Sequence, residues 1–457
     1  MMYCKEINKE QKFDVVVCGG GFSGFAAAYS AAREELNVLL IEKSAALGGV
    51  GTCGLVNHLL GERSIRSGVI SKCVGGIFDT LEKRLIDRGF GLELSRENLD
   101  LSPHGWYSSL GIGLIFDNEG MKLVLEEMAT EVGVNILYTT QIVDAVCENG
   151  KITSLILVNK SGFSKVNARY FIDATGDGDI FAMSGCSFKS GDEDGKFAAA
   201  SLEMHLENVD SQALTNYMKE TGDLRFRNII EKLKKSGEWP FPYEIFISVM
   251  LMEKDVFMIN TIRQVGVDGT CASSISDATI TGRAENFKLW EIAKKHFPGF
   301  ENSRIRAIAP SIGIRETRRL CGEYILSPED IINGKEFYDS IAVSGYGFDL
   351  PHPLKPSFQP LEKAQRKSPY TEIPYRCLLP KEISNLLVAG RCISAQRDAL
   401  GPIRVMGVCI AQGEAAGIAA MLAVKNNTSF KNVDIKKLKS LLKERGAITC
   451  RDEVEEL

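Results

Sequence analysis

The sequence predicts an α/β protein in which a parallel sheet, extended by an antiparallel meander, carries an inserted α+β domain. Three observations predict this fold class. An apolar run near the N-terminus stops at glycines and continues as an alanine-rich helix. Runs of strand length separated by turn signals lie between residues 135 and 174. A further apolar run, 384–390, precedes a second helix rich in alanine and glycine.

The first strand and the glycines after it have the form of a phosphate-binding turn. Residues 13–18, FDVVVC, are nearly all apolar, as expected of a parallel strand covered on both faces. Gly19, Gly21 and Gly24 then give the G-x-G-x-x-G spacing, which provides a tight turn, close approach of a pyrophosphate and close packing of helix on strand. We expect a helix from about Phe22 whose first N–H groups bind phosphate.

The second strand, 38–41, ends in Glu42, roughly 20 residues beyond the first glycine, where a carboxylate accepts the ribose hydroxyls of a dinucleotide. Strand, glycines, helix, strand and acid together predict a Rossmann-like unit over the alternative, a glycine-rich turn in an unrelated α/β protein. The acid occurs in both NAD and FAD domains. The small residues that follow, 48–54 with Gly49 and Thr52 among them, favour a planar flavin ring lying close to the backbone.

Length and composition fit a large soluble enzyme. The chain has 457 residues, enough for more than one domain, and its net charge of −5 argues against binding to nucleic acid or an anionic membrane. The sequence contains no run of about 18 uninterrupted apolar residues and therefore predicts no membrane helix. The polar N-terminus does not resemble a signal peptide. We therefore expect a cytoplasmic protein.

The cysteine pattern indicates reduced thiols. Twelve cysteines occur without a C-x-x-C pair, so the sequence predicts no metal site and no disulfide framework. Cys53 lies among the small residues after Glu42, but packing is the common role of a lone cysteine.

A second loop of glycines and acids follows the meander. A helix near residues 118–131 and a strand at 135–138 precede apolar runs with turns near 148–150 and 160–162. We expect the meander to lead into a last strand, 170–174, and then the loop from Thr175 through Gly176 to Asp179. Such loops at the carboxyl ends of parallel strands bind ligands in open α/β sheets.

Several separated segments resemble one protein family. GGGFSG at 19–24, ATGDGD at 174–179, GIRETRRL at 313–320, IPYRCLLPKEISNLLVAGRCIS at 373–394 and ALGPIRVMGVCIAQGEAAGIAA at 399–420 are similar to the bacterial FAD-dependent oxidoreductases of the glutathione-reductase-like superfold. The resemblance extends from about Phe13 to Ala423 and is weakest near 190–250. It implies a Rossmann-like FAD-binding domain and FAD as cofactor more firmly than it implies a reaction.

The resemblance also implies how the late segments serve the cofactor. The strand ending at Gly390 rejoins the first domain, and the turn from Gly401 to Gly407 brings a helix N-terminus and Arg404 to the flavin, unless Arg404 is only an ion-pair residue. Thr52 then borders the ring and Val143 flanks the adenine. The expected cofactor-binding set is Gly19, Gly21, Phe22, Ser23, Gly24, Glu42, Lys43, Gly49, Thr52, Val143, Ala174, Thr175, Gly176, Asp179, Gly390, Arg391, Arg404 and Val405.

The expected domains are a first part of the FAD-binding domain at 1–185, an inserted substrate-side domain at 186–372, a returning part at 373–430 and a helical tail at 431–457. Within the insertion lie Asn260, Arg263 and three arginines of GIRETRRL. We expect two of these three, Arg318 and Arg319, to be structural. Arg315 is a candidate contact to substrate or flavin, because a planar guanidinium binds carboxylates in a bidentate manner.

Candidates for proton transfer are few. His58 follows the flavin-side glycines, His352 lies in a proline-bounded loop, and Tyr375 precedes the returning strand, so each is a candidate, although such residues commonly serve structure. His205 and His296 are expected to be structural.

The sequence as a whole predicts an FAD-dependent oxidoreductase that transfers a hydride between the flavin and a small organic substrate, an anionic one if the arginines bind it. The alternative is a flavin subunit that passes electrons to a separate iron–sulfur or other redox partner protein. A scaffold that has lost its cofactor is a third reading, against which the intact glycine and acid motifs argue. Substrate identity, oligomeric state and covalent attachment of the flavin stay open.

Overall fold

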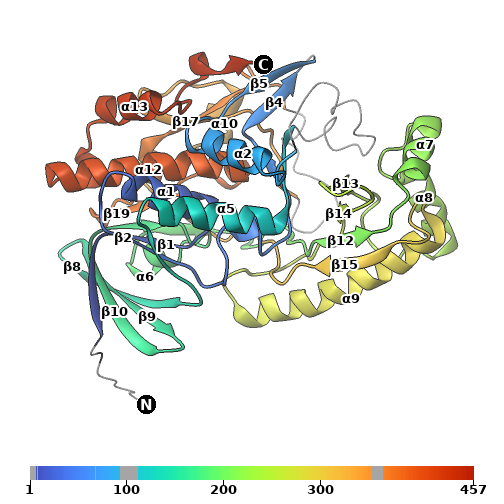
Figure 1. Ribbon diagram of the computed structural model, residues 1–457, viewed down its shortest axis with the longest axis horizontal. Coiled ribbons are helices and arrows are strands. Elements are labelled where there is room, and N and C mark those ends of the chain that lie inside the picture. Colours follow the sequence, from blue (N-terminus) through green and yellow to red (C-terminus); the bar gives the residue numbers. More distant parts are fainter. Residues whose placement is uncertain (1–6, 8, 67, 93–111, 352–363) are drawn as a thin grey trace.

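The computed structural model describes residues 7, 9–66, 68–92, 112–351 and 364–457. A larger body holds the predicted parallel sheet, and a smaller lobe formed by α7, α8, α9 and β12–β15 projects from it (Figure 1). The fold class predicted from the sequence is therefore confirmed: a mixed α/β protein with a parallel-strand sheet and antiparallel sheets.

The main sheet has seven strands. Its central strand β1 (Glu10–Cys18) pairs in parallel with β2 (Val38–Ile41) on one side and β10 (Gly162–Asp173) on the other, and β7 (Asn135–Leu137) extends it beyond β2. The first half of β10 pairs with the meander strand β9 (Lys151–Asn159), which pairs with β8 (Gln141–Glu148), and its last residues pair with β19 (Leu386–Val388). The expected last strand at 170–174 is thus the end of one long strand, because β10 takes two partners in succession along the same side.

The register of the parallel strands brings the motifs together. Cys18 lies opposite Ile41 on β2 and opposite Asp173 on β10, and Asp173 lies opposite Val388 on β19. The four strands therefore end at one edge of the sheet. The glycine turn, Glu42, the 174–179 loop and Gly390 all follow at this edge, where open α/β sheets bind ligands.

Two helices distant in sequence pack closely behind this edge. Helix α1 (Phe22–Ala32) and helix α12 (Met406–Asn426) meet at small residues: a Cβ added to Gly413 would lie 2.1 Å from the Ser23 carbonyl oxygen, and one added to Gly417 would lie 2.4 Å from that of Ala27. Helix α12 has the length and hydropathy of a membrane span, but 94% of its most apolar window is buried inside the protein, as in the core helix of a soluble protein.

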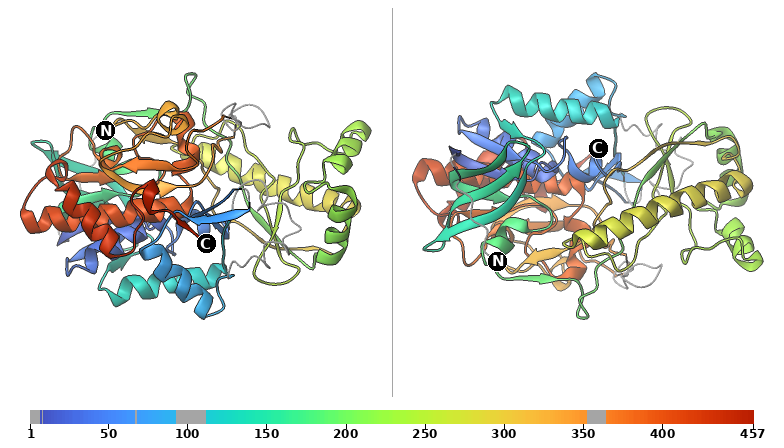
Figure 2. Two further views of the ribbon diagram at one scale, coloured as in Figure 1. Left: turned by 90° about the horizontal axis from the view of Figure 1, so that it is seen from above. Right: turned by 90° about the horizontal axis from the view of Figure 1, so that it is seen from below.

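The projecting lobe has its own sheet and an aromatic core. Its strands run in the order β13 (Ser248–Met250), β14 (Phe257–Ile259), β12 (Met204–Glu207), β15 (Arg304–Ile308), all antiparallel. Helices α7 (Ser211–Thr221), α8 (Arg227–Ser236) and α9 (Ala272–His296) complete it (Figure 2). Phe226 stacks on Phe297 with ring centroids 4.7 Å apart at the centre of this core.

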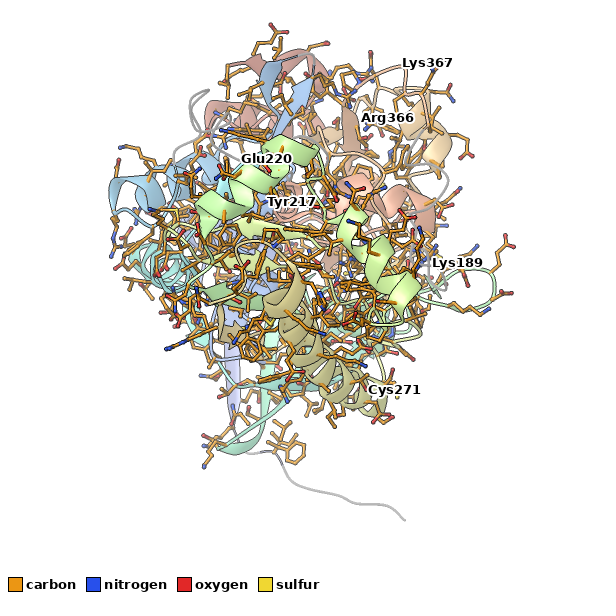
Figure 3. The ribbon with its side chains drawn as sticks, turned by 90° about the vertical axis from the view of Figure 1, so that its right-hand side faces the viewer. Lys189, Tyr217, Glu220, Cys271, Arg366 and Lys367 are labelled. Carbon is orange, nitrogen blue, oxygen red and sulfur yellow. The ribbon has the colours of Figure 1, made fainter. Side chains whose placement is uncertain are left out.

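Figure 3 looks onto the end of the lobe, with Tyr217 and Glu220 of α7 and with Cys271, which precedes α9. The predicted domain boundaries stay predictions. Part of the expected insertion belongs to the core of the main body, however: Leu320, Ile341 and Ala342 pack there.

The other helices and strands surround these two units. They are β3 (His58–Leu60), β4 (Arg63–Arg66), β5 (Val69–Lys72), α2 (Ile77–Asp87), β6 (Gly113–Ile115), α5 (Asn118–Glu131), α6 (Asp179–Met183), β11 (Phe188–Ser190), β16 (Arg318–Leu320), α10 (Pro328–Ile332), β17 (Ser340–Ser344), β18 (Thr371–Pro374), α11 (Leu400–Ile403), α13 (Ile435–Glu444) and β20 (Glu455–Glu456).

Candidate functional site

A cavity of about 530 Å³ lies at the carboxyl edge of the parallel sheet and extends to the projecting lobe. It collects most of the residues predicted from the sequence. From the expected cofactor set, its walls include Gly19, Gly21, Phe22, Ser23, Glu42, Lys43, Gly49, Ala174, Thr175, Gly176, Asp179, Gly390, Arg391, Arg404 and Val405. Two of the candidate catalytic residues, His58 and Arg315, also line it.

Glycine is suited to each of the three positions of the first turn for a different structural reason. Gly19 has a φ of +97°, and a Cβ there would lie 2.5 Å from the Ala174 carbonyl oxygen. A Cβ on Gly24 would lie 1.8 Å from the Gly19 carbonyl oxygen, so Gly24 serves helix packing and does not line the cavity. Gly21 has an ordinary φ of −64°, and a Cβ there would meet no protein atom within 4 Å. The backbone at Gly21 therefore leaves a space that only a side chain or a ligand would fill, and no side chain caps the first N–H groups of α1.

Glu42 ties the glycine turn to the second strand. Its Oε2 accepts a hydrogen bond of 2.6 Å from the Gly20 N–H, and its Oε1 accepts bonds of 2.7 Å from the N–H and the hydroxyl of Ser44. A carboxylate offers about four acceptor positions. Glu42 therefore holds the loop in place and still has capacity for a ribose hydroxyl in the cavity that it lines.

The second loop is fixed from beneath by Asp173. Its Oδ1 accepts from the N–H and hydroxyl of Thr175, and its Oδ2 accepts from the N–H groups of Ile180 and Phe181 at the start of α6. Burial raises the pKa of Asp173 to about 6, against the lowering effect of these hydrogen bonds. The loop that carries Gly176 to the cavity is thus held by a buried carboxyl group.

Charges are arranged along the cavity wall. Asp177 forms an ion pair with Arg391 and accepts a hydrogen bond of 3.0 Å from the Thr317 hydroxyl. Lys43 lies 3.8 Å from the same carboxylate, but its side chain is 62% exposed, so this contact contributes little. Arg391 also donates to the Ile314 carbonyl oxygen at 2.8 Å, which connects the returning strand to the GIRETRRL segment.

A cluster of cationic side chains lies at the lobe side of the cavity. Arg315 donates to the Ala199 carbonyl oxygen at 2.6 Å, and burial, with the charges of Arg404 and Arg263, lowers the pKa of its guanidinium to about 10. Arg404 donates to the backbone oxygen of Asp349 at 2.7 Å and lies 3.3 Å from its carboxylate.

The other two arginines of the segment bind protein groups. Arg318 lies 2.9 Å from the Asp179 carboxylate, and Arg319 donates to the Gly191 carbonyl oxygen at 2.9 Å. Neither lines the cavity.

Several predicted residues lie elsewhere. Thr52 donates a hydrogen bond from its hydroxyl to the Leu47 carbonyl oxygen and lines a neighbouring cavity. Val143 is 40% exposed, whereas the adjacent residue Ile142 lines the cavity of about 530 Å³. Tyr375 is buried outside the cavity and donates its hydroxyl to the Phe430 carbonyl oxygen at 3.0 Å. His352 lies outside the described residues.

The histidines that the structure describes differ in setting. Burial lowers the pKa of His58 to about 3, so its imidazole, which interacts with the Gly113 backbone, is neutral at physiological pH. His205 on β12 has its Nε2 at 3.0 Å from the Leu55 carbonyl oxygen, and His296 at the end of α9 lies 3.2 Å from Glu238.

A second cavity, of about 800 Å³, adjoins the first between the main body and the lobe. The two share Ser44, Cys53 and Ser311 on their walls. Several residues on the wall of the first cavity were not singled out from the sequence, among them Ser201, Glu203, Tyr346 and Asp349. For Glu203 a signal existed in the alternation of SLEMHLE at 201–207.

Comparison with known proteins gives a match over most of the chain. A family model described as FAD dependent oxidoreductase matches residues 14–442.

Among solved structures, similar ones include a geranylgeranyl bacteriochlorophyll reductase-like protein from Thermoplasma acidophilum (15% identity, 95% of this chain and 84% of that chain, TM-score 0.47). Another is p-nitrophenol 4-monooxygenase PnpA from Pseudomonas putida DLL-E4 (10% identity, 95% and 84%, TM-score 0.48). A third is OxyS anhydrotetracycline hydroxylase from Streptomyces rimosus (11% identity, 95% and 66%, TM-score 0.44).

Proposed function

Because the chain belongs to the FAD dependent oxidoreductase family, we propose that it transfers a hydride between its flavin and a small organic anion held by Arg315. The bound FAD supplies the two-electron chemistry, and the protein supplies binding, orientation and charge. The residues of the cavity fit an extended dinucleotide. The open backbone at Gly21 and the uncapped start of α1 suit the pyrophosphate, and Glu42 suits the ribose.

The flavin end of the cavity has a second helix terminus. Val405 precedes α12 without a side-chain cap, and Val405, Met406 and Cys409 all line the cavity. The positive end of a 21-residue helix, together with Arg404, would stabilise negative charge on the reduced ring. This arrangement supports the expectation that the ring lies at α12 with the substrate on the lobe side.

The observation that carries the substrate proposal is the environment of Arg315. Its guanidinium is partly buried in the cavity wall, where its hydrogen bond within the described residues goes to a neutral carbonyl oxygen, that of Ala199. A guanidinium has five N–H donors in a planar fork that matches a carboxylate. The charges of Arg404 and Arg263 act on Arg315 more strongly than the opposing charges of Asp349 and Glu203, so an anion would relieve the repulsion among the three cations.

The test replaces Arg315 by methionine and uses Arg318→Met as the matched control, because Arg318 does not line the cavity. Candidate organic acids are mixed with the FAD-loaded protein without oxygen, and bleaching of the flavin absorbance is followed. We expect Arg315→Met to lose apparent affinity at least tenfold, about 1.4 kcal/mol, and Arg263→Met to weaken binding by the same mechanism. Wild-type affinity in both variants would refute the anion site.

A further inference from the structure

The strand that brings the lobe to the cavity presents a polar face. From residue 201 onward, side chains alternate across β12 and the residue run that leads into it. Leu202, Met204 and Leu206 pack into the hydrophobic cores of the lobe. Ser201 and Glu203 line the cofactor cavity, and His205 lines its neighbour.

Backbone pairing places Glu203 beside the arginine that we assign to the anion. The N–H of Gly313 donates to the Ser201 carbonyl oxygen at 2.7 Å, and the N–H of Ala309 donates to that of Glu203 at 2.9 Å. These bonds hold the Glu203 backbone at the cavity, where Glu203 and Arg315 line the same wall and the charge of Arg315 acts on the Glu203 carboxyl group. The two are not among the ion pairs within 4 Å in the described part of the chain, so Arg315 does not neutralise it by direct contact.

The Glu203 carboxyl group differs from the other buried acids of the described chain. Asp173 and Glu414 accept hydrogen bonds from backbone N–H groups, and Glu316 pairs with Arg397 at 2.9 Å. Glu62 and Glu316 also have an Oε2 without a hydrogen-bond partner in the described part of the chain, but each accepts a hydrogen bond at Oε1. Glu203 is 2% exposed, and within the described residues neither of its carboxyl oxygens takes part in a hydrogen bond or ion pair. An unsatisfied buried carboxyl oxygen lowers the stability of the folded protein. A carboxyl group that bears this cost on the wall of a reaction cavity is a candidate for the chemistry.

Resting on the proposed function, we infer that Glu203 is the acid–base group of the reaction and that the substrate is a hydroxy acid. The carboxylate of the substrate lies on Arg315, and its hydroxyl group faces Glu203. In the oxidation, the C–H bond breaks and its electron pair leaves with the hydrogen as hydride to the flavin. The O–H bond breaks, its proton goes to the Glu203 carboxylate, and the remaining O–H electrons form the carbonyl. Reduction of a keto acid reverses each transfer.

Charge favours a hydroxyl over an amino group. At Arg315 the charges of Arg404 and Arg263 outweigh those of Asp349 and Glu203, so an ammonium group brought there would be repelled on balance. A neutral hydroxyl avoids this cost. A hydroxy acid therefore fits this site: the cationic wall binds its carboxylate group, and the Glu203 carboxylate accepts the proton of its hydroxyl group.

The first experiment measures binding without turnover. Oxalate, which is fully ionised near neutral pH and has no C–H bond to oxidise, is titrated into the FAD-loaded protein between about pH 7 and pH 9, with the flavin spectrum or heat as readout. Burial raises the pKa of Glu203 to about 8, although Arg315 opposes the shift. We expect oxalate affinity to fall severalfold over this range as Glu203 ionises and repels the anion, and to stay constant in Glu203→Gln.

Three other titratable groups on the cavity wall keep their charge between pH 7 and 9. Burial raises the pKa of Tyr346 well above its usual range and that of Cys409 to about 12, and it lowers the pKa of His58 to about 3. Glu62→Gln is the matched variant, because Glu62 is also fully buried with a pKa raised to about 8 but does not line the cavity. Glu62→Gln should keep the wild-type pH dependence.

The second experiment follows flavin bleaching at about pH 9, where the Glu203 carboxyl group is mainly ionised and can accept a proton, by a 2-hydroxy acid that reduces the wild-type protein. Glu203→Gln should lower the limiting rate at least 100-fold, within the range for loss of general acid–base catalysis, and should leave the apparent affinity near neutral pH within about twofold.

The outcomes separate the two proposals. If Arg315→Met binds oxalate like the wild type, the anion site itself is wrong. If Arg315→Met loses binding while Glu203→Gln keeps both the pH dependence and the rate of bleaching, the role of Glu203 is wrong and the proposed function stands. If amino acids bleach the wild-type flavin and hydroxy acids do not, the substrate class is wrong.

Discussion

Replacing Gly21 by valine should weaken FAD binding at least about 10-fold while leaving the fold intact. The backbone at Gly21 has a φ of −64°, which any residue adopts, and a Cβ there meets no protein atom within 4 Å. The valine side chain would occupy cavity space where we place the pyrophosphate. Loss of even one charge-assisted hydrogen bond from a backbone N–H to phosphate costs about 1.5–3 kcal/mol, which weakens FAD binding roughly 10- to 150-fold.

The assay measures the ratio of flavin to protein absorbance after purification, the affinity of the apoprotein for added FAD, and the melting temperature without FAD. Gly347→Val is the matched control, because Gly347 is equally open but does not line the cavity. Gly24→Ala should instead lower the melting temperature, since its Cβ would lie 1.8 Å from a backbone oxygen. A Gly21→Val protein that retains stoichiometric FAD with wild-type affinity would refute the assignment of this turn.

Three further predictions concern single charged groups. Glu42→Arg should yield colourless protein, because it removes the acceptor of the Gly20 N–H and puts a cation at the ribose position; full FAD content after purification would contradict this. Arg404→Ala should lower the reduction potential of the bound flavin, measured by dye equilibration, because a cation beside the reduced ring is lost. An unchanged potential would show that Arg404 has only a structural role, through its hydrogen bond to Asp349. For Glu414, burial raises the folded-state pKa from 4.5 to about 7, so the folded protein binds the proton more tightly than the unfolded chain. The wild type should therefore lose stability as pH rises from about 4.5 through 7, and Glu414→Gln should lose less, because Asp173, Glu62 and Glu203 still contribute; melting temperatures that fall in parallel for both proteins would show that Glu414 is not the cause.

The sequence predicted which residues of the first βαβ unit meet at the cavity because the determinants are local. Strand, glycines, helix and acid follow one another within residues 13–42, and each has a backbone reason that the structure displays. The place of Glu203 could not be predicted in this way. Alternation in residues 201–207 shows that one face is polar, but only pairing with residues 309–313, a hundred positions away, turns that face to the cavity.

Local irregularities explain why some side chains lie away from the cavity. Val143 lies at a register shift between Ile142 and Asp144 in the pairing of β8 with β9, so simple alternation along the strand fails there. Tyr375 lies in a short turn, and its hydroxyl reaches Phe430, a contact that depends on where the C-terminal segment returns. These side-chain positions depend on tertiary contacts, which the periodicity of a single sequence does not predict.

The close contact between α1 and α12 sets an order for biosynthesis. The helix that presents its N-terminus to phosphate is made long before Gly413 and Gly417, the glycines that cover it. At about 5–20 residues per second, the interval on the ribosome is roughly 20–80 s. During this time the alanine face of α1 lacks its native cover, so we expect the nascent chain to need protection from aggregation and to acquire FAD only after α12 has been made.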